Sequence, residues 1–192
     1  MLNGIKTLKF GVEDFEKSKQ YLNDFGLKLV ESDLPDTLKY QLNNCSAVYV
    51  FKIDDPRLPK AFESGSTLRE VTWAVNRAQD ITRLAETLKN EPGYRFENGI
   101  VTCQDPNGMT LVFEEAILKP EKEVTSLPVN QYGQINRINQ PSPVYQQADP
   151  VSIGHVVFFT PDLETTQKFY EDKLGFYLSD AYRGRGAFMR CA

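Results

Sequence analysis

The chain has 192 residues, of which 41% are hydrophobic and 25% are charged, a composition typical of a globular protein long enough to bury a core. A net charge of -4 without clustered basic residues argues against a nucleic-acid partner, and no apolar run approaches the ~20 residues that would span a membrane. The first residues lack the basic and apolar regions of an export signal, so we expect a cytoplasmic protein with a small-molecule partner.

The first 53 residues predict a β-α-β-β-β unit. Apolar residues alternate over 6–12, which favours a strand, and Asp14 is placed to cap the helix that follows. Gly26 is placed to end this helix, and strands are predicted over 27–31, 37–42 and 47–53. The helix would lay an apolar stripe on the sheet, formed by Phe15, Ser18, Tyr21, Leu22 and Phe25.

The same pattern restarts after a connection at 54–67 that is rich in Asp, Pro, Ser and Gly. A strand is predicted over 68–75 and a helix over 78–90, with apolar residues at helical spacing. Asn98-Gly99 is a strong hairpin signal between strands at 94–97 and 100–104, because both residues tolerate positive φ. The turn Asp105-Pro106-Asn107-Gly108 then precedes a strand at 109–114. Residues 1–115 therefore read as one domain of two paired units.

Residues 116–150 differ in character, because prolines are spread among Gln, Asn and Ser with little hydrophobic period. We interpret them as a linker. The unit begins a third time over 151–192, with a predicted strand near 153–160, a helix between Asp162 and Gly175, and strands at 176–180 and 186–191. This third unit is incomplete at Ala192.

The third unit contains the only histidine, His155. On the predicted strand it shares a face with Val157 and Phe159, and in the first unit the equivalent position is Thr7. The three cysteines, Cys45, Cys103 and Cys191, show no C-x-x-C spacing, so we expect buried or half-buried thiols and not a disulfide framework, a zinc site or a nucleophile.

The repeated units, the strand-borne His155, the turn at 105–108 and the Phe-Tyr-Glu-Asp-Lys-Leu-Gly-Phe run at 169–176 together resemble the vicinal oxygen chelate superfamily. It comprises glyoxalases, bleomycin- and fosfomycin-resistance proteins and type I extradiol ring-cleavage dioxygenases. The layout is most similar to the dioxygenases, with two modules, a linker and a second domain opening at His155. The resemblance implies an α+β fold of tandem β-α-β-β-β modules forming U-shaped open barrels, the last module being incomplete.

In that dioxygenase family two histidines and a glutamate hold Fe(II), less often Mn(II). The resemblance assigns His155 to the first histidine and places Val157 and Phe188 beside the substrate. One histidine cannot complete this ligand set, so we expect an N-terminal fragment of a longer enzyme, inactive alone and binding no metal by itself. Thr7, Glu70 and Val112 fall where related modules place ligands, and we expect Glu70 to be solvated or ion-paired, with Arg69 or Arg77 near in sequence.

The function that the resemblance favours is cleavage of a catechol-type aromatic diol with Fe(II) and O2. A non-catalytic small-ligand binder of the resistance type is one alternative, and a glyoxalase-type lyase or isomerase is the other. Glyoxalases place ligands in both paired modules, so Thr7 and Val112 disfavour the second alternative. The unfinished third unit leaves open edges, which predicts self-association into a homo-oligomer.

Overall fold

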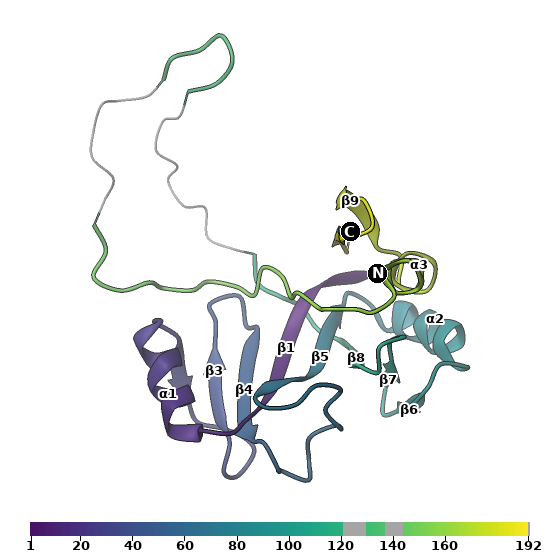
Figure 1. Ribbon diagram of the computed structural model, residues 1–192, viewed down its shortest axis with the longest axis horizontal. Helices are drawn as coiled ribbons and strands as arrows, with labels where there is room; N and C mark the ends of the chain where they lie inside the picture. The colour runs from purple at the N-terminus through teal and green to yellow at the C-terminus, as the bar shows by residue number, and fades with distance from the viewer. Residues whose placement is uncertain (121–129, 137–143, 192) are drawn as a thin grey trace.

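Two successive β-α-β-β-β modules build one eight-stranded sheet in the computed structural model, which describes residues 1–120, 130–136 and 144–191 (Figure 1). The first module consists of β1 (Leu2–Val12), α1 (Phe15–Asp24), β2 (Lys28–Val30), β3 (Leu38–Gln41) and β4 (Ala47–Lys52). The second consists of β5 (Thr67–Val75), α2 (Ala78–Leu88), β6 (Arg95–Glu97), β7 (Ile100–Gln104) and β8 (Thr110–Glu115). Both modules occur as the sequence predicts, with boundaries shifted by a few residues.

The order of the strands is β2-β3-β4-β1-β5-β8-β7-β6, so the first strands of the two modules lie side by side at the centre. β1 runs antiparallel to β5 and parallel to β4, and β5 runs parallel to β8, which gives each module the same internal topology. The sheet is open, with short edge strands at β2 and β6, and the predicted α+β class is confirmed.

Local signals explain where the elements begin and end. The Asp14 carboxylate accepts a hydrogen bond from the backbone N–H of Lys17, which caps α1. The hairpin between β6 and β7 turns at Asn98 and Gly99, whose φ angles are 51° and 76°, as the Asn-Gly signal predicts.

The main core lies between the sheet and α2, where Ile81, Ala85 and Leu88 are buried against strand residues such as Val71 and Phe113. α1 is held less tightly. Only Phe15 and Leu22 of its predicted stripe pack on the sheet as partly buried apolar side chains.

The prediction was wrong for Tyr21 and Phe25, which are exposed and stack on each other with ring centroids 6.3 Å apart. At about 100° per residue their positions lie roughly a quarter-turn away from Phe15 and Leu22, so they project beside the sheet and not onto it.

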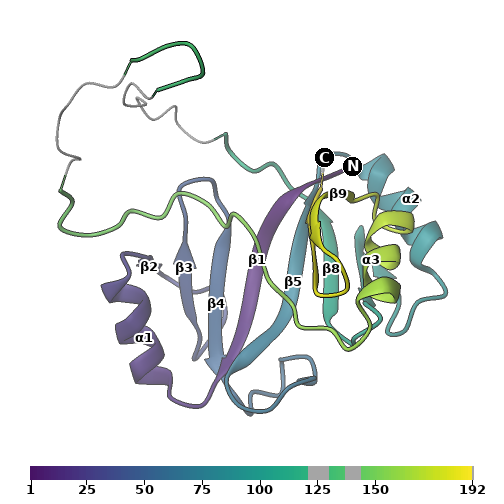
Figure 2. The same cartoon turned by 45° about the horizontal axis from the view of Figure 1, so that its top comes forward.

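The third module contributes α3 (Leu163–Asp172), β9 (Tyr177–Tyr182) and β10 (Gly186–Arg190). α3 lies beside α2 in both Figure 1 and Figure 2. It buries Phe169 and Tyr170 in the main core, and Phe176 just after it meets Trp73 edge-on at 5.2 Å. β9 and β10 pair antiparallel in a separate two-stranded sheet.

The strand predicted near 153–160 is absent: residues 151–160 adopt an extended path without strand pairing. Figure 2 shows this stretch, which carries His155, crossing the face of the sheet before α3. Apolar side chains on one face of this segment pack on the core, while its backbone forms no ladder of strand hydrogen bonds. The sequence pattern does not separate these two cases.

The predicted linker, 116–150, falls in part on 121–129 and 137–143, which lie outside the described residues. Its two ends meet at one place, because Lys119 N–H donates to the Asn44 carbonyl and Asn44 N–H donates to the Val151 carbonyl, each at 3.0 Å. In the described part of the chain, no helix has the length and apolarity to cross a membrane.

Candidate functional site

The extended segment around His155 presents two different faces. Ile153, Val156 and Phe158 turn toward the protein and pack against the main core. His155, Val157 and Phe159 turn outward, and Val157 is 72% exposed. The division of faces predicted from the sequence is therefore confirmed, although the segment is not a strand. The imidazole of His155 is exposed and available to a ligand.

Phe188 lies on β10, in the hairpin that follows α3, and is 53% exposed. Its ring meets that of Tyr182 edge-on, with centroids 5.8 Å apart. All residues of β9 are exposed, so this hairpin presents aromatic side chains to solvent instead of burying them. Val157, Phe188 and His155 are thus outward-facing residues on two separate elements of the third module.

The described residues do not form a metal site. No group of three or more His, Cys, Asp or Glu side chains able to hold a metal ion occurs within 1–120, 130–136 and 144–191. His155 is the only histidine of the whole sequence, so two histidines and a carboxylate cannot assemble from this chain. The residues present do not fit the Fe(II) or Mn(II) that the resemblance implies, and His155 supplies a single imidazole.

In the N-terminal pair of modules, Thr7 and Val112 fall where related modules place ligands, and the sheet register brings them into one row with Thr72. Thr7 pairs with Thr72 across β1 and β5, and Thr72 pairs with Val112 across β5 and β8, so the three lie in one row. A hydroxyl, a hydroxyl and an isopropyl group give this row no metal ligand of the kind that His155 represents.

Glu70 is the carboxylate nearest to this row along β5, and it is already paired. It lies opposite Lys9 in the register, and the Lys9 Nζ is 2.8 Å from the Glu70 Oε1. The expected partners were wrong, because the neighbouring Arg69 donates to the carbonyls of Ile53 and Pro59 in the connection after β4. Lys9 is opposite Glu70 on the adjacent strand, where side chains lie close enough to pair.

Two of the three thiols, Cys103 and Cys191, are made unreactive at neutral pH by burial. Burial raises the pKa of Cys103 to about 12, and burial also raises the pKa of Cys191. Both thiols therefore stay protonated and are poor nucleophiles. This agrees with the expectation that the cysteines are buried or half-buried.

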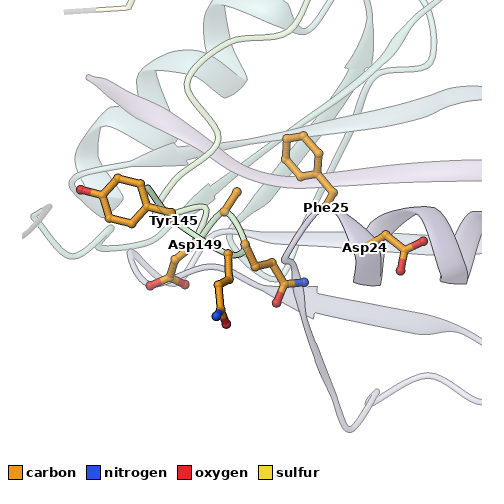
Figure 3. Close-up of a pocket in the computed structure, with 7 residues that line it drawn as sticks. Asp24, Phe25, Tyr145 and Asp149 are labelled. Atoms are coloured by element: carbon orange, nitrogen blue, oxygen red, sulfur yellow. The ribbon is translucent and has the colours of Figure 1, made fainter. Parts of the chain in front are cut away.

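An open pocket of about 630 Å³ lies where the end of α1 meets residues 145–149 (Figure 3). Gln147 donates to the Asn23 carbonyl at 2.8 Å, and Lys28 pairs with Asp149 at 2.8 Å, which holds the chain against α1. Gly26 has φ of 97°, and a Cβ there would lie 2.0 Å from the Ala148 carbonyl oxygen, so only glycine allows this approach. None of the residues assigned to a site from the sequence lines this pocket.

The sequence reasoning missed a polar contact between the turn at 105–108 and the start of α3. Asn107 hydrogen-bonds both Thr160 and Thr166. The sequence signals a turn at this place, yet nothing local to it indicates a partner more than fifty residues away.

The arrangement of modules in this chain matches a known fold. Two paired modules in one open eight-stranded sheet, with a third module attached, form the fold of the glyoxalase/bleomycin resistance/dioxygenase superfamily. The family model "Glyoxalase/Bleomycin resistance protein/Dioxygenase superfamily" matches residues 152–192, the stretch that contains His155. A comparison with curated proteins found no match in sequence.

Solved structures match nearly the whole chain at low identity. The Mn(II)-bound glyoxalase from Novosphingobium aromaticivorans shares 19% identity with a TM-score of 0.68, over 99% of this chain and 58% of that one. A catechol 2,3-dioxygenase shares 18% identity with a TM-score of 0.62, over 98% and 63% of the two chains. BphC, a halotolerant catechol dioxygenase, shares 15% identity with a TM-score of 0.64, over 94% and 57%. These matches establish the fold, and the chain spans about 57 to 63% of the length of these structures.

Proposed function

We propose that this chain carries the scaffold domain and the first metal ligand of a dioxygenase that cleaves a catechol-type aromatic diol with O2. The observation that carries the proposal is the placement of His155. It is the sole histidine, it lies within the stretch that matches the family model, and its ring is exposed on the outward face of its segment. The likeness in fold to two catechol dioxygenases supports the same choice.

The proposal divides the chain into three parts. Residues 1–115 form a scaffold domain, since Thr7 and Val112 offer no ligands and Glu70 is neutralised by Lys9. Residues 116–150 are a linker, and residues 151–192 begin the domain that performs the chemistry. In this arrangement Val157 and Phe188 contact the aromatic diol through their exposed apolar surfaces.

The proposed enzyme needs ligands that these 192 residues do not supply. We place the second histidine and the glutamate in sequence beyond Ala192, and we assign the metal as Fe(II), or Mn(II) in its place. His155 alone offers one nitrogen donor, which is too few to hold either ion firmly.

Two measurements test the proposal. Sequencing the source gene downstream of Ala192 is expected to show a His-His pair soon after it and a glutamate near the end of the next module. The 192-residue chain, loaded anaerobically with Fe(II) and then given catechol and O2, is expected to form no coloured ring-cleavage product. A stop codon directly after Ala192, or product formation by this chain alone, would contradict the proposal.

A glyoxalase-type lyase or isomerase is a second candidate, because the Mn(II)-bound glyoxalase gives a TM-score of 0.68 over 99% of the chain. Oxygen consumption by the product of the full-length source gene separates the two. A ring-cleaving dioxygenase takes up one O2 for each diol, whereas a lyase or isomerase turns over at the same rate without O2. Binding without turnover of either kind would instead indicate the resistance-type ligand binder.

The exposed aromatic hairpin also supports a homo-oligomer. Tyr177, Tyr182 and Phe188 are all exposed on β9 and β10, and exposed apolar surface of this kind favours association. Sedimentation of the 192-residue chain is expected to show a mass that rises with concentration, and Phe188→Lys is expected to lower it. A monomer at all concentrations would contradict the assignment.

A further inference from the structure

The turn between β7 and β8 is held rigid by its own hydrogen bonds. Asp105 is almost fully buried, and its Oδ1 accepts from the backbone N–H groups of Asn107 at 2.8 Å and Met109 at 3.0 Å. Gly108 N–H also donates to the Asp105 carbonyl at 2.9 Å. The turn therefore holds the Asn107 side chain in a fixed place at the end of the sheet.

The amide of Asn107 uses both its donor and its acceptor on the third module. Its Nδ2 donates to the Thr166 Oγ1 at 3.1 Å, and its Oδ1 accepts from the Thr160 Oγ1 at 2.7 Å. The two threonines lie on either side of Asp162, which caps α3, and both bond the backbone of that residue. Asn107 thus bonds one residue before the cap of α3 and one residue within α3.

A further hydrogen bond between the turn and α3 lies one helical turn along from Thr166. The Tyr170 hydroxyl, buried in the core, donates to the Asp105 Oδ2 at 3.2 Å. Thr166 and Tyr170 are four residues apart, so they share the face of α3 that meets the turn. Lys173 then pairs with Glu91, which follows α2, at 2.7 Å.

We propose that Asn107 is a positioning residue for His155: the turn at 105–108 fixes the start of α3 and, through Thr160, the extended segment that carries the histidine. Apolar contacts such as Trp73 with Phe176 also attach the third module, but burial of apolar surface is non-directional and does not select one register. Hydrogen bonds between a rigidly held amide and two hydroxyls do select one register of the third module on the sheet. His155 lies five residues before Thr160 on the same segment.

The chain offers direct reporters of this positioning. Because His155 is the only histidine, its ring protons give one set of signals in an NMR spectrum. Trp73 is the only tryptophan, is 5% exposed and touches Phe176, so its fluorescence reports whether the third module stays attached. Neither reporter needs a metal or a substrate, so the inference stands or fails separately from the proposed enzyme activity.

The test compares Asn107→Ala, Thr166→Val and the double variant. Each single change is expected to shift and broaden the His155 ring signals and to raise amide exchange in α3 about tenfold over that in α2, with Trp73 fluorescence unchanged. The double variant is expected to exchange more slowly than the product of the two single effects predicts, because the two changes share the Asn107–Thr166 contact, while Asn107→Ala also removes the contact with Thr160.

Two further variants complete the test. Thr166→Ser keeps the hydroxyl and is expected to restore the His155 signals. Thr82→Val removes a hydroxyl that bonds the backbone four residues earlier in α2, at 3.3 Å, and is expected to leave them unchanged. Wild-type His155 signals in Asn107→Ala, or effects of the two single changes that multiply in the double variant, would overturn the inference.

Discussion

The N-terminal pair of modules and the third module share one pattern and use it differently. In the pair, β1 and β5 lie side by side at the centre of the sheet, and the buried core on this sheet receives side chains from α2 and also from α3 of the third module. In the third module, β9 and β10 form a separate two-stranded sheet whose side chains are largely exposed. The pair has packing without metal ligands, and the third module has the histidine without a complete sheet. The function proposed above would thus assign stability and chemistry to different copies of the same unit.

The difference in stability between the two regions is tested most strongly by making a Phe→Ala substitution in each of them. Phe113 on β8 is fully buried, so Phe113→Ala is expected to lower the free energy of unfolding by about 3 to 5 kcal/mol. Phe188→Ala removes a half-exposed ring that meets Tyr182 edge-on, so it is expected to cost about 1 kcal/mol or less. Urea unfolding followed by Trp73 fluorescence measures both. Equal losses would show that the third module contributes as much to stability as the pair does.

A smaller effect tests the charge pair of the scaffold. Glu70→Gln leaves Lys9 without its carboxylate partner in a largely buried position, so it is expected to cost about 1 to 2 kcal/mol of unfolding free energy. The matched control in the third module is Glu164→Gln, an exposed residue of α3, with an expected change within about 0.5 kcal/mol. Denaturant titration of both variants gives the comparison. A negligible cost for Glu70→Gln would mean that the Lys9 pair does not hold the sheet.

The smallest effect concerns the two equivalent helix caps. Hydrogen bonds from the backbone and side chain of Lys17 lower the pKa of Asp14, and hydrogen bonds from the side chain and backbone of Thr165 lower the pKa of Asp162. A carboxyl whose pKa is lower in the folded state stabilises it fully above its ordinary value near 4, and this stabilisation is lost as the pH falls through the lowered pKa. Amide exchange in α1 and α3, taken relative to the intrinsic exchange rate at each pH, is therefore expected to speed up below about pH 4.

The matched variant for the caps is Asp162→Asn, which keeps the capping oxygen but does not titrate. It is expected to remove the acid-induced increase from α3 and to leave the increase in α1. An increase of the same size in α3 of the variant would assign the pH dependence to a group other than the cap.

Much of the fold follows from short-range chemistry in the sequence. The cap at Asp14 and the Asn98-Gly99 hairpin are interactions between near neighbours, which the sequence displays directly. The extended segment of His155 was predicted as a strand. This prediction was wrong, because alternating apolar residues suit an extended segment that packs on a core equally well. The faces were predicted correctly, since alternation sets them in either case.

The contacts that place the candidate site could not be predicted, because they depend on distant partners. Lys9 and Glu70 meet through a strand register that contains bulges, and Asn107 meets Thr160 and Thr166 only after the third module attaches. Neither pairing leaves a local signal, so the expected partners Arg69 and Arg77 were wrong.

The assignment of chemistry to the third module is tested most directly in the product of the full-length source gene, by O2 uptake with catechol after loading with Fe(II). His155→Ala is expected to reduce the rate by at least about a hundredfold, since the proposal makes His155 a direct metal ligand, whose loss is a larger change than that of an outer-shell partner. Glu70→Gln is expected to leave the rate within about threefold, because Glu70 belongs to the scaffold. Full activity in His155→Ala, or an equal loss in Glu70→Gln, would contradict the account.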